Sequence, residues 1–133
     1  MTIDFPRAAL IIVDVQNDFC PGGKLGIEDG DKVIEPLNRL SQLFADKGGR
    51  VVATQDWHPQ GHVSFELWPS HCVQGSRGAD FHDGLGLKSV NLIIRKGFRA
   101  ELDSYSAFFE NDHKTSTGLD GFLKALSINT VVL

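Results

Sequence analysis

The apolar run at residues 8–13 constrains the fold of this chain most, because it is continuous rather than alternating. A strand with one face in water alternates apolar and polar residues, whereas a strand buried on both faces is apolar throughout. Residues 51–54 and 92–94 form two further short runs, and a fourth begins at Thr130. These runs predict four strands of a mostly parallel sheet.

Two segments between the runs carry apolar residues at helical spacing. The first begins after Asp31 and stops at Gly48, a residue type that commonly ends helices. Its apolar positions are Val33, Ile34, Leu37, Leu40, Leu43 and Phe44. The second has Thr117 as its predicted N-cap. Its apolar positions are Leu119, Phe122, Leu123 and Leu126. Alternating strands and helices predict an α/β fold, a mostly parallel sheet flanked by helices.

Composition and charge restrict the class of protein. The 133 residues fit one domain, and 41% apolar residues suffice for a core. Thirteen basic and seventeen acidic residues give a net charge of −4 without a basic stripe, which argues against a nucleic-acid partner. No apolar run could span a bilayer, and the N-terminus lacks a signal-peptide pattern. Two cysteines argue against a disulfide framework, so we expect a cytoplasmic protein without a membrane partner.

Asp56, His58 and His71 form a candidate metal site. A carboxylate and an imidazole two residues apart in an extended segment point to the same side. A short loop could return the second imidazole to them, which gives three protein ligands and leaves coordination positions open. Open positions are typical of a catalytic or substrate-binding metal rather than a structural one. A polar surface turn is the alternative interpretation of a D-x-H pattern.

Charged residues follow three of the predicted strands. Asp14 follows the first strand, Asp56 the second and Lys96 the third. In an open parallel sheet, ligands bind outside the carboxyl ends of the strands, so these side chains are predicted to meet at one edge. An Asp and a Lys that face each other across a cleft hold each other's charge and tune the pKa of a third group.

A nucleophile would complete this set, and cysteine is the natural candidate beside a base and a cation. Cys20 follows the first strand and could lie near the cleft, whereas Cys72 adjoins a candidate metal ligand and is expected to be a packed thiol. Neither follows a strand on a turn into a helix. Residues 1–133 are therefore expected to be a single α/β domain that is incomplete at its C-terminus, with the nucleophile beyond Leu133.

Motifs along the chain resemble, in order, those of the nicotinamidase/pyrazinamidase branch of the isochorismatase-like cysteine hydrolases. The matching segments are residues 14–23 (DVQNDFCPGG), 54–59 (TQDWHP), 62–65 (HVSF), 68–75 (WPSHCVQG), 95–97 (RKG) and 103–108 (DSYSAF). The resemblance runs from about residue 8 to the end, and its metal segment is typical of this branch. It implies an isochorismatase-like, Rossmann-like three-layer fold, here apparently truncated at the fourth strand.

The resemblance also implies roles for the candidate residues. Asp14 would be the general base that takes the thiol proton, and Lys96 would balance its charge. Asp56, His58 and His71 would bind one divalent metal ion. Zinc is the first candidate, and iron and manganese are the alternatives. The metal would hold the ring nitrogen of nicotinamide and orient its carboxamide.

The substrate pocket follows from the same resemblance. Phe19 and Trp68 would sandwich the pyridine ring, and Tyr105 would line the pocket; ordinary core packing is the alternative for these aromatic residues. The resemblance leaves open an approach of His62 to the metal, and a loop position is the favoured interpretation here. The reaction implied is hydrolysis of nicotinamide to nicotinate and ammonia through a cysteine thioester, a step of NAD salvage.

Two alternative functions stay open. One is a related amidohydrolase that acts on another small carboxamide, because pocket depth cannot be read from sequence. The other is a non-catalytic remnant that binds metal or nicotinamide, which follows from the missing cysteine. In each case the partner is a small molecule, and the sequence leaves a homo-oligomer open.

Overall fold

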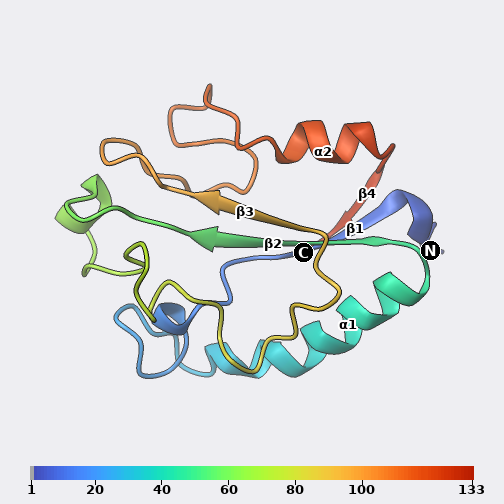
Figure 1. Cartoon of the computed structure of the whole chain (residues 1–133), viewed down its shortest axis with the longest axis horizontal. Coiled ribbons are helices and arrows are strands. Elements are labelled where there is room, and N and C mark those ends of the chain that lie inside the picture. Colours follow the sequence, from blue (N-terminus) through green and yellow to red (C-terminus); the bar gives the residue numbers. More distant parts are fainter. Residues whose placement is uncertain (1) are drawn as a thin grey trace.

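The computed structural model describes residues 2–133, which form a sheet of four parallel strands (Figure 1). The strands lie in the order β3-β2-β1-β4. Their bounds are Ala8–Ile12 (β1), Arg50–Asp56 (β2), Leu92–Lys96 (β3) and Thr130–Val132 (β4). The predicted α/β class with a parallel sheet is therefore confirmed. β2 and β3 extend two residues further than their apolar runs, because polar residues at their ends still pair between the strands.

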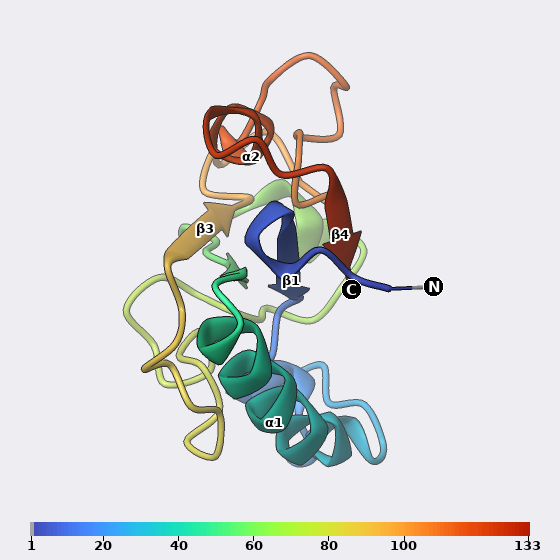
Figure 2. The ribbon, with the colours of Figure 1, turned by 90° about the vertical axis from the view of Figure 1, so that its right-hand side faces the viewer.

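One helix covers each face of the sheet. α1 (Ile34–Asp46) and α2 (Leu119–Ala125) lie on opposite sides, with the strands between them (Figure 2). Within residues 2–133, four short 3-10 helices complete the elements: η1 (Phe5–Arg7), η2 (Asn17–Phe19), η3 (Gly30–Val33) and η4 (Val63–Glu66). The first predicted helix therefore begins as a 3-10 turn and continues as α1.

The predicted cap of the second helix was wrong by one residue. Gly118, in the left-handed conformation with φ of 93°, is the N-cap of α2. The Thr117 hydroxyl nevertheless accepts a hydrogen bond from the Leu119 N–H at 3.3 Å, so it still satisfies a free donor at the start of the helix. Among the helices of residues 2–133, none combines the length and apolar character needed to cross a bilayer.

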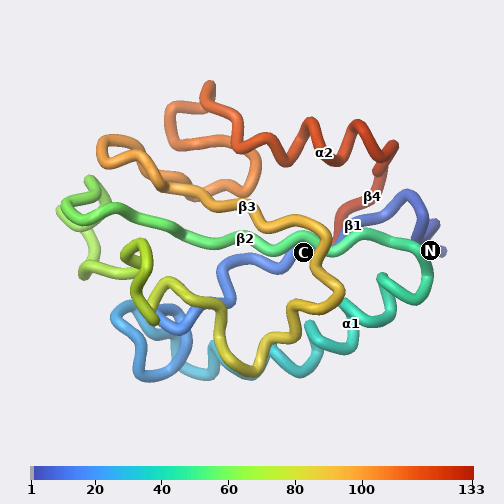
Figure 3. Tube along the Cα trace, in the orientation of Figure 1, coloured from blue at the N-terminus to red at the C-terminus, as the bar shows by residue number. Residues whose placement is uncertain are grey.

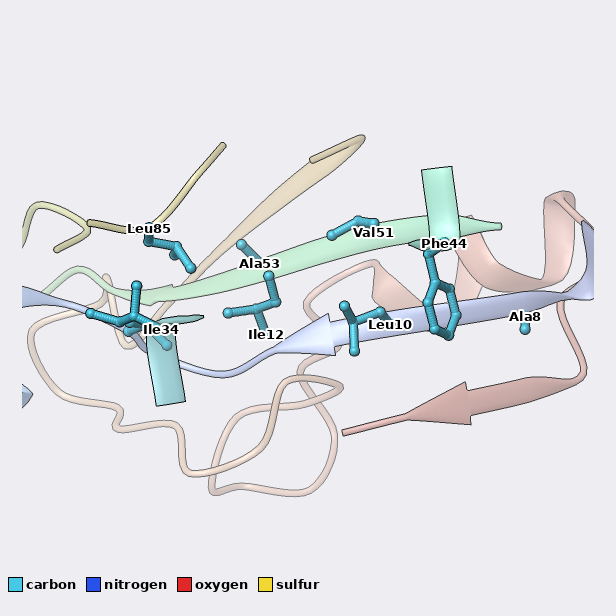
Figure 4. Close-up of a cluster of buried hydrophobic side chains, with 9 residues drawn as sticks. Ala8, Leu10, Ile12, Ile34, Phe44, Val51, Ala53 and Leu85 are labelled. Atoms are coloured by element: carbon cyan, nitrogen blue, oxygen red, sulfur yellow. The ribbon is translucent and has the colours of Figure 1, made fainter. Parts of the chain in front are cut away.

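The central strand β1 organises the core, since all five of its residues are buried. Alternate side chains of β1 point to opposite faces, so two clusters form. The cluster under α1 is shown in Figure 4 and comprises Ala8, Leu10, Ile12, Val15, Ile34, Phe44, Val51, Ala53 and Leu85. The cluster under α2 comprises Ala9, Ile11, Val52, Ile94, Leu119 and Leu123. Full burial of one Leu or Ile side chain stabilises the fold by about 1.5–3 kcal/mol.

The register of the strands determines which residues meet at the carboxyl edge. Asp56 at the end of β2 is paired with Lys96 at the end of β3, and Ile12 of β1 is paired with Ala53 of β2. The loops that follow β1, β2 and β3 therefore gather at one end of the sheet (Figure 3). This is the edge at which ligands bind in open parallel sheets.

Candidate active site

A cavity of about 200 Å³ opens at the carboxyl edge of the sheet. Its lining residues are Asp14, Phe19, Leu25, Asp56, Trp68, His71, Lys96, Asp103, Ser104 and Tyr105. Seven of the eight predicted site residues are among them, and the eighth, His58, lies behind Asp56 and His71. The structure thus brings together predicted residues from strand ends and loops that are as far apart in the sequence as Asp14 and Tyr105.

Lys96 lies at the centre of the charged part of the cavity. Its Nζ is 2.9 Å from Oδ2 of Asp14 and 2.5 Å from Oδ1 of Asp56, and it donates to the Ser104 carbonyl at 3.1 Å. These three acceptors match the three ammonium protons. Lys96 is 3% exposed, so its charge is held by the protein rather than by water.

Backbone strain and a threonine position Asp14. Asp14 has a φ of 51°, which is uncommon for a residue other than glycine, and this angle turns the chain sharply after β1. The Thr54 hydroxyl donates to Oδ1 of Asp14 at 2.6 Å and accepts from the Asp14 N–H at 3.1 Å. Asp14 thereby presents one oxygen to Lys96 while the other is held by Thr54.

The two carboxyls are shifted in opposite directions. Burial raises the pKa of Asp14, and repulsion by Asp56 adds to this, although Lys96 acts against it. Burial also opposes ionisation of Asp56, but the adjacent His58 and the Lys96 ammonium leave its pKa lowered. Burial lowers the pKa of Lys96, and the two carboxylates more than offset it, so that pKa is raised. Asp14 is therefore the carboxyl better suited to take up a proton.

The imidazoles of His58 and His71 converge on the second oxygen of Asp56. Oδ2 of Asp56 lies 3.5 Å from Nε2 of His58 and 4.0 Å from Nε2 of His71. Each ring is anchored through its other nitrogen: Nδ1 of His58 donates to the Gly97 carbonyl and Nδ1 of His71 to the Pro69 carbonyl, both at 2.7 Å.

This donor set fits a divalent metal ion. When Nδ1 carries the proton, Nε2 keeps the lone pair that binds a metal, and both Nε2 atoms face the same carboxylate oxygen. The ligand atoms of Asp56, His58 and His71 lie within 4.8 Å of one another, and all three residues are buried. Two imidazoles and one carboxylate are ligands of catalytic zinc and of other transition metals.

His62 was expected to be a loop residue, and it is the N-cap of η4. It is nevertheless buried, and its ring stacks on His58 with centroids 4.1 Å apart. Nδ1 of His62 is 2.7 Å from the Ser64 hydroxyl, and Nε2 is 3.2 Å from the Leu102 carbonyl. In this arrangement both ring nitrogens contact protein groups, and His62 packs against a candidate ligand.

The three aromatic residues lie at different depths in the cavity. Phe19 is half-buried, and its ring is tilted against His71 with centroids 5.6 Å apart. Trp68 is 47% exposed and Tyr105 is 70% exposed, which leaves both at the rim. A flat ring that entered the cavity could therefore contact aromatic side chains both inside and at the mouth.

Two buried polar residues support the site and were not predicted from the sequence. The Gln16 side chain accepts from the Asp56 N–H and donates to the Asp56 and Ala79 carbonyls, each at 2.8 Å. Asp18 accepts from the Cys72 N–H at 2.7 Å, next to His71, where Cys72 has a φ of 46°. Both residues lie in the DVQNDF segment, so their position near Asp14 was the available signal.

Neither cysteine lines the cavity. Cys72 is fully buried as expected, and burial raises the pKa of its thiol. Cys20 is also buried and adjoins a separate hollow beside Gly22 and Arg77. Burial raises the pKa of Cys20 too, so neither thiol has the environment of an activated nucleophile.

Comparisons with known proteins agree with this fold. Residues 8–133 match the Isochorismatase domain. The nicotinamidase of Acinetobacter baylyi is 46% identical, with 96% of this chain and 67% of the relative covered. The chain therefore belongs to the isochorismatase family, within its nicotinamidase/pyrazinamidase branch.

Solved structures of relatives superpose closely on the chain. PnC1 from L. infantum in complex with nicotinate has a TM-score of 0.92 at 43% identity, covering 98% of this chain and 67% of its own. A pyrazinamidase of Pyrococcus horikoshii in complex with zinc has a TM-score of 0.83 at 38% identity, covering 95% and 68%. The chain spans about two thirds of the length of these relatives.

Proposed function

We propose that this protein hydrolyses nicotinamide to nicotinate and ammonia. The proposal rests on one observation: Asp14, Lys96 and Asp56 line the same cavity, and His58 and His71 lie near the second carboxylate oxygen of Asp56. The 46% identical nicotinamidase and the nicotinate-bound relative support the same substrate.

In the proposed reaction, Asp14 takes the proton of a thiol, whose sulfur then adds to the carboxamide carbon. The proton passes to the amide nitrogen, the carbon–nitrogen bond breaks and ammonia leaves a thioester. Water adds to the thioester, Asp14 again takes the proton, and nicotinate leaves as the thiol is restored. The raised pKa of Asp14 suits this alternation between base and acid.

We propose that the thiol belongs to a residue that follows β4 in the sequence. This strand is parallel to β1, with Ala8 paired to Thr130 and Leu10 to Val132. A residue that follows β4 would therefore approach the edge where Asp14 lies. Lys96 would hold Asp14 in place and reduce the cost of negative charge on sulfur and on the carbonyl oxygen.

Asp56, His58 and His71 are the proposed ligands of one divalent ion, with zinc as the first candidate. When bound, the ion would supply a Lewis acid for the ring nitrogen of the substrate. The anchored Nδ1 atoms of the two histidines would fix the ligand directions, and Phe19 and Trp68 would hold the ring plane. The free buried cysteines also support a reducing, cytoplasmic location.

The test is ammonia release from nicotinamide by the zinc-loaded full-length gene product, compared with benzamide, which lacks the ring nitrogen. We expect ammonia from nicotinamide and much less from benzamide. Binding of nicotinamide without ammonia release would instead support a binding-only protein. Failure to bind nicotinamide would overturn the proposal, and faster release from another carboxamide would redirect it to that substrate.

A further inference from the structure

Asp103 is a third carboxylate in the wall of the cavity, and no role was predicted for it from the sequence. Asp14 and Asp56 share the Lys96 ammonium, whereas Asp103 makes no ion pair within the described residues 2–133. Oδ1 of Asp103 accepts from the Ser104 N–H at 2.8 Å. Its Oδ2 has no hydrogen-bond donor in the part of the chain that the structure describes.

The backbone holds this carboxylate in place. Three consecutive carbonyls of the segment 102–104 each contact a different partner: Leu102 meets Nε2 of His62 at 3.2 Å, and Ser104 accepts from Lys96 at 3.1 Å. The Asp103 carbonyl between them accepts from the Asn111 N–H at 2.8 Å. The segment is thus tied to both the histidine cluster and the lysine, which makes the Asp103 charge a fixed feature of the cavity.

The charge of Asp103 determines the formal charge of the cavity when a divalent ion is bound. Asp14, Asp56 and Asp103 oppose the single ammonium of Lys96, and one divalent cation at the histidines would bring the formal sum to zero. Without Asp103 the occupied site would carry a net positive charge and would favour an anionic ligand. Hydrolysis of a carboxamide converts a neutral ligand into an anion in this same cavity.

We propose that Asp103 is a specificity-determining residue that makes the cavity prefer the neutral amide over its carboxylate product. This inference rests on the proposed function. Asp103 repels the carboxylate through space, so it lowers product affinity and speeds product release while it leaves amide binding nearly unchanged. It does not touch the reacting bond and is not a catalytic residue.

The test is Asp103→Asn in the zinc-loaded full-length protein, with dissociation constants for nicotinamide and nicotinate measured by calorimetry. Asn retains an oxygen for the Ser104 N–H, so the turn is preserved. We expect nicotinate to bind roughly three- to tenfold more tightly to the variant, with nicotinamide affinity changed less than about twofold. The difference between variant and wild type should shrink in high salt, because salt screens a charge effect and not a shape effect.

Two further variants serve as controls. Glu101→Gln removes the same charge from an exposed residue of the same loop and should leave the ratio of the two affinities unchanged. Asp103→Glu keeps the charge and should retain the wild-type preference. An unchanged ratio in Asp103→Asn, or an equal change in Glu101→Gln, overturns the inference while the proposed function stands. A wild type that binds neither ligand overturns both.

Discussion

Asp56 contacts Lys96 through one carboxylate oxygen and faces two imidazoles with the other. Oδ1 is 2.5 Å from Nζ of Lys96, and Oδ2 is 3.5 Å from Nε2 of His58. The strand register explains the first contact, because Asp56 and Lys96 are direct partners in β2 and β3. The ligand cluster and the lysine of the proposed reaction are therefore joined through a single side chain.

Removal of a proposed metal ligand should abolish stoichiometric metal binding. In Asp56→Ala or His58→Ala, two of three protein ligands remain, and we expect metal affinity to fall by more than about 100-fold, beyond the usual effect of a supporting residue. Metal content after gel filtration should drop from one ion per chain to nearly none. His113→Ala, at an exposed histidine outside the cavity, is the matched control and should retain one ion. Full metal content in both ligand variants would refute the assignment.

Substitution of Asp14 by Asn should stop turnover and spare the metal site. Loss of a general base typically slows a reaction by roughly 10²- to 10⁴-fold. We expect that reduction in ammonia release from nicotinamide by the full-length protein, with one metal ion still bound. Turnover near the wild-type rate would remove Asp14 from the role of base.

The same variant should be more stable than the wild type at neutral pH. Burial raises the pKa of Asp14 above its ordinary value of 3.8, so the folded state binds the proton more tightly than the unfolded state. The stability contribution of this carboxyl is then fully present below pH 3.8 and is lost as the pH rises through the folded pKa. Thermal unfolding of metal-free protein between pH 4 and 7 should show the advantage of Asp14→Asn growing with pH. A constant difference would mean that the carboxyl is not destabilised by burial.

The layers of the fold and most of the cavity could be predicted from sequence, because they follow from periodicity and from strand direction. The run at residues 8–13 predicted a doubly buried strand, which is confirmed for residues 8–12, whereas Val13 lies beyond the strand and is 50% exposed. Parallel strands bring Asp14, Asp56 and Lys96 to one edge. The pairing of Asp56 with Lys96 needed the register, which depends on how the whole sheet packs.

Residues that act through the backbone could not be predicted. Gln16 contacts the N–H and the carbonyl of Asp56, and its position near Asp14 in the sequence does not reveal which groups its side chain bonds. Asp103 reaches the cavity only because the irregular loop after β3 folds back on Lys96 and His62. Loop paths of this kind are set by tertiary hydrogen bonds rather than by local propensity.

Gly97 should be essential for the position of His58. It has a φ of 61°, and a Cβ there would lie 2.5 Å from Cε1 of His58. Gly97→Ala should therefore displace the ring, weaken metal binding by about 10- to 100-fold and add a backbone cost of about 1–3 kcal/mol. Gly118→Ala is the control, since φ is 93° and an added Cβ would meet no atom within 4 Å in the described part of the chain beyond its two sequence neighbours. It should lose stability and keep metal affinity. Equal metal affinity in both variants would show that Gly97 serves the backbone alone.

Gln16 should be required for both stability and metal binding, although it touches no proposed ligand atom. Gln16→Leu has a similar size but leaves the N–H and carbonyl of Asp56 without their partners inside the protein. A buried polar group without a partner costs about 1–3 kcal/mol, so urea unfolding should reveal a loss of at least that size. Gln42→Leu is the control: the side chain of this exposed glutamine donates to Asp46 within α1, and its replacement should change stability by less than about 0.5 kcal/mol. Because the peptide groups of Asp56 would shift toward other partners, metal affinity should fall in Gln16→Leu and not in Gln42→Leu. Wild-type metal affinity in a destabilised Gln16→Leu would limit the residue to a role in folding.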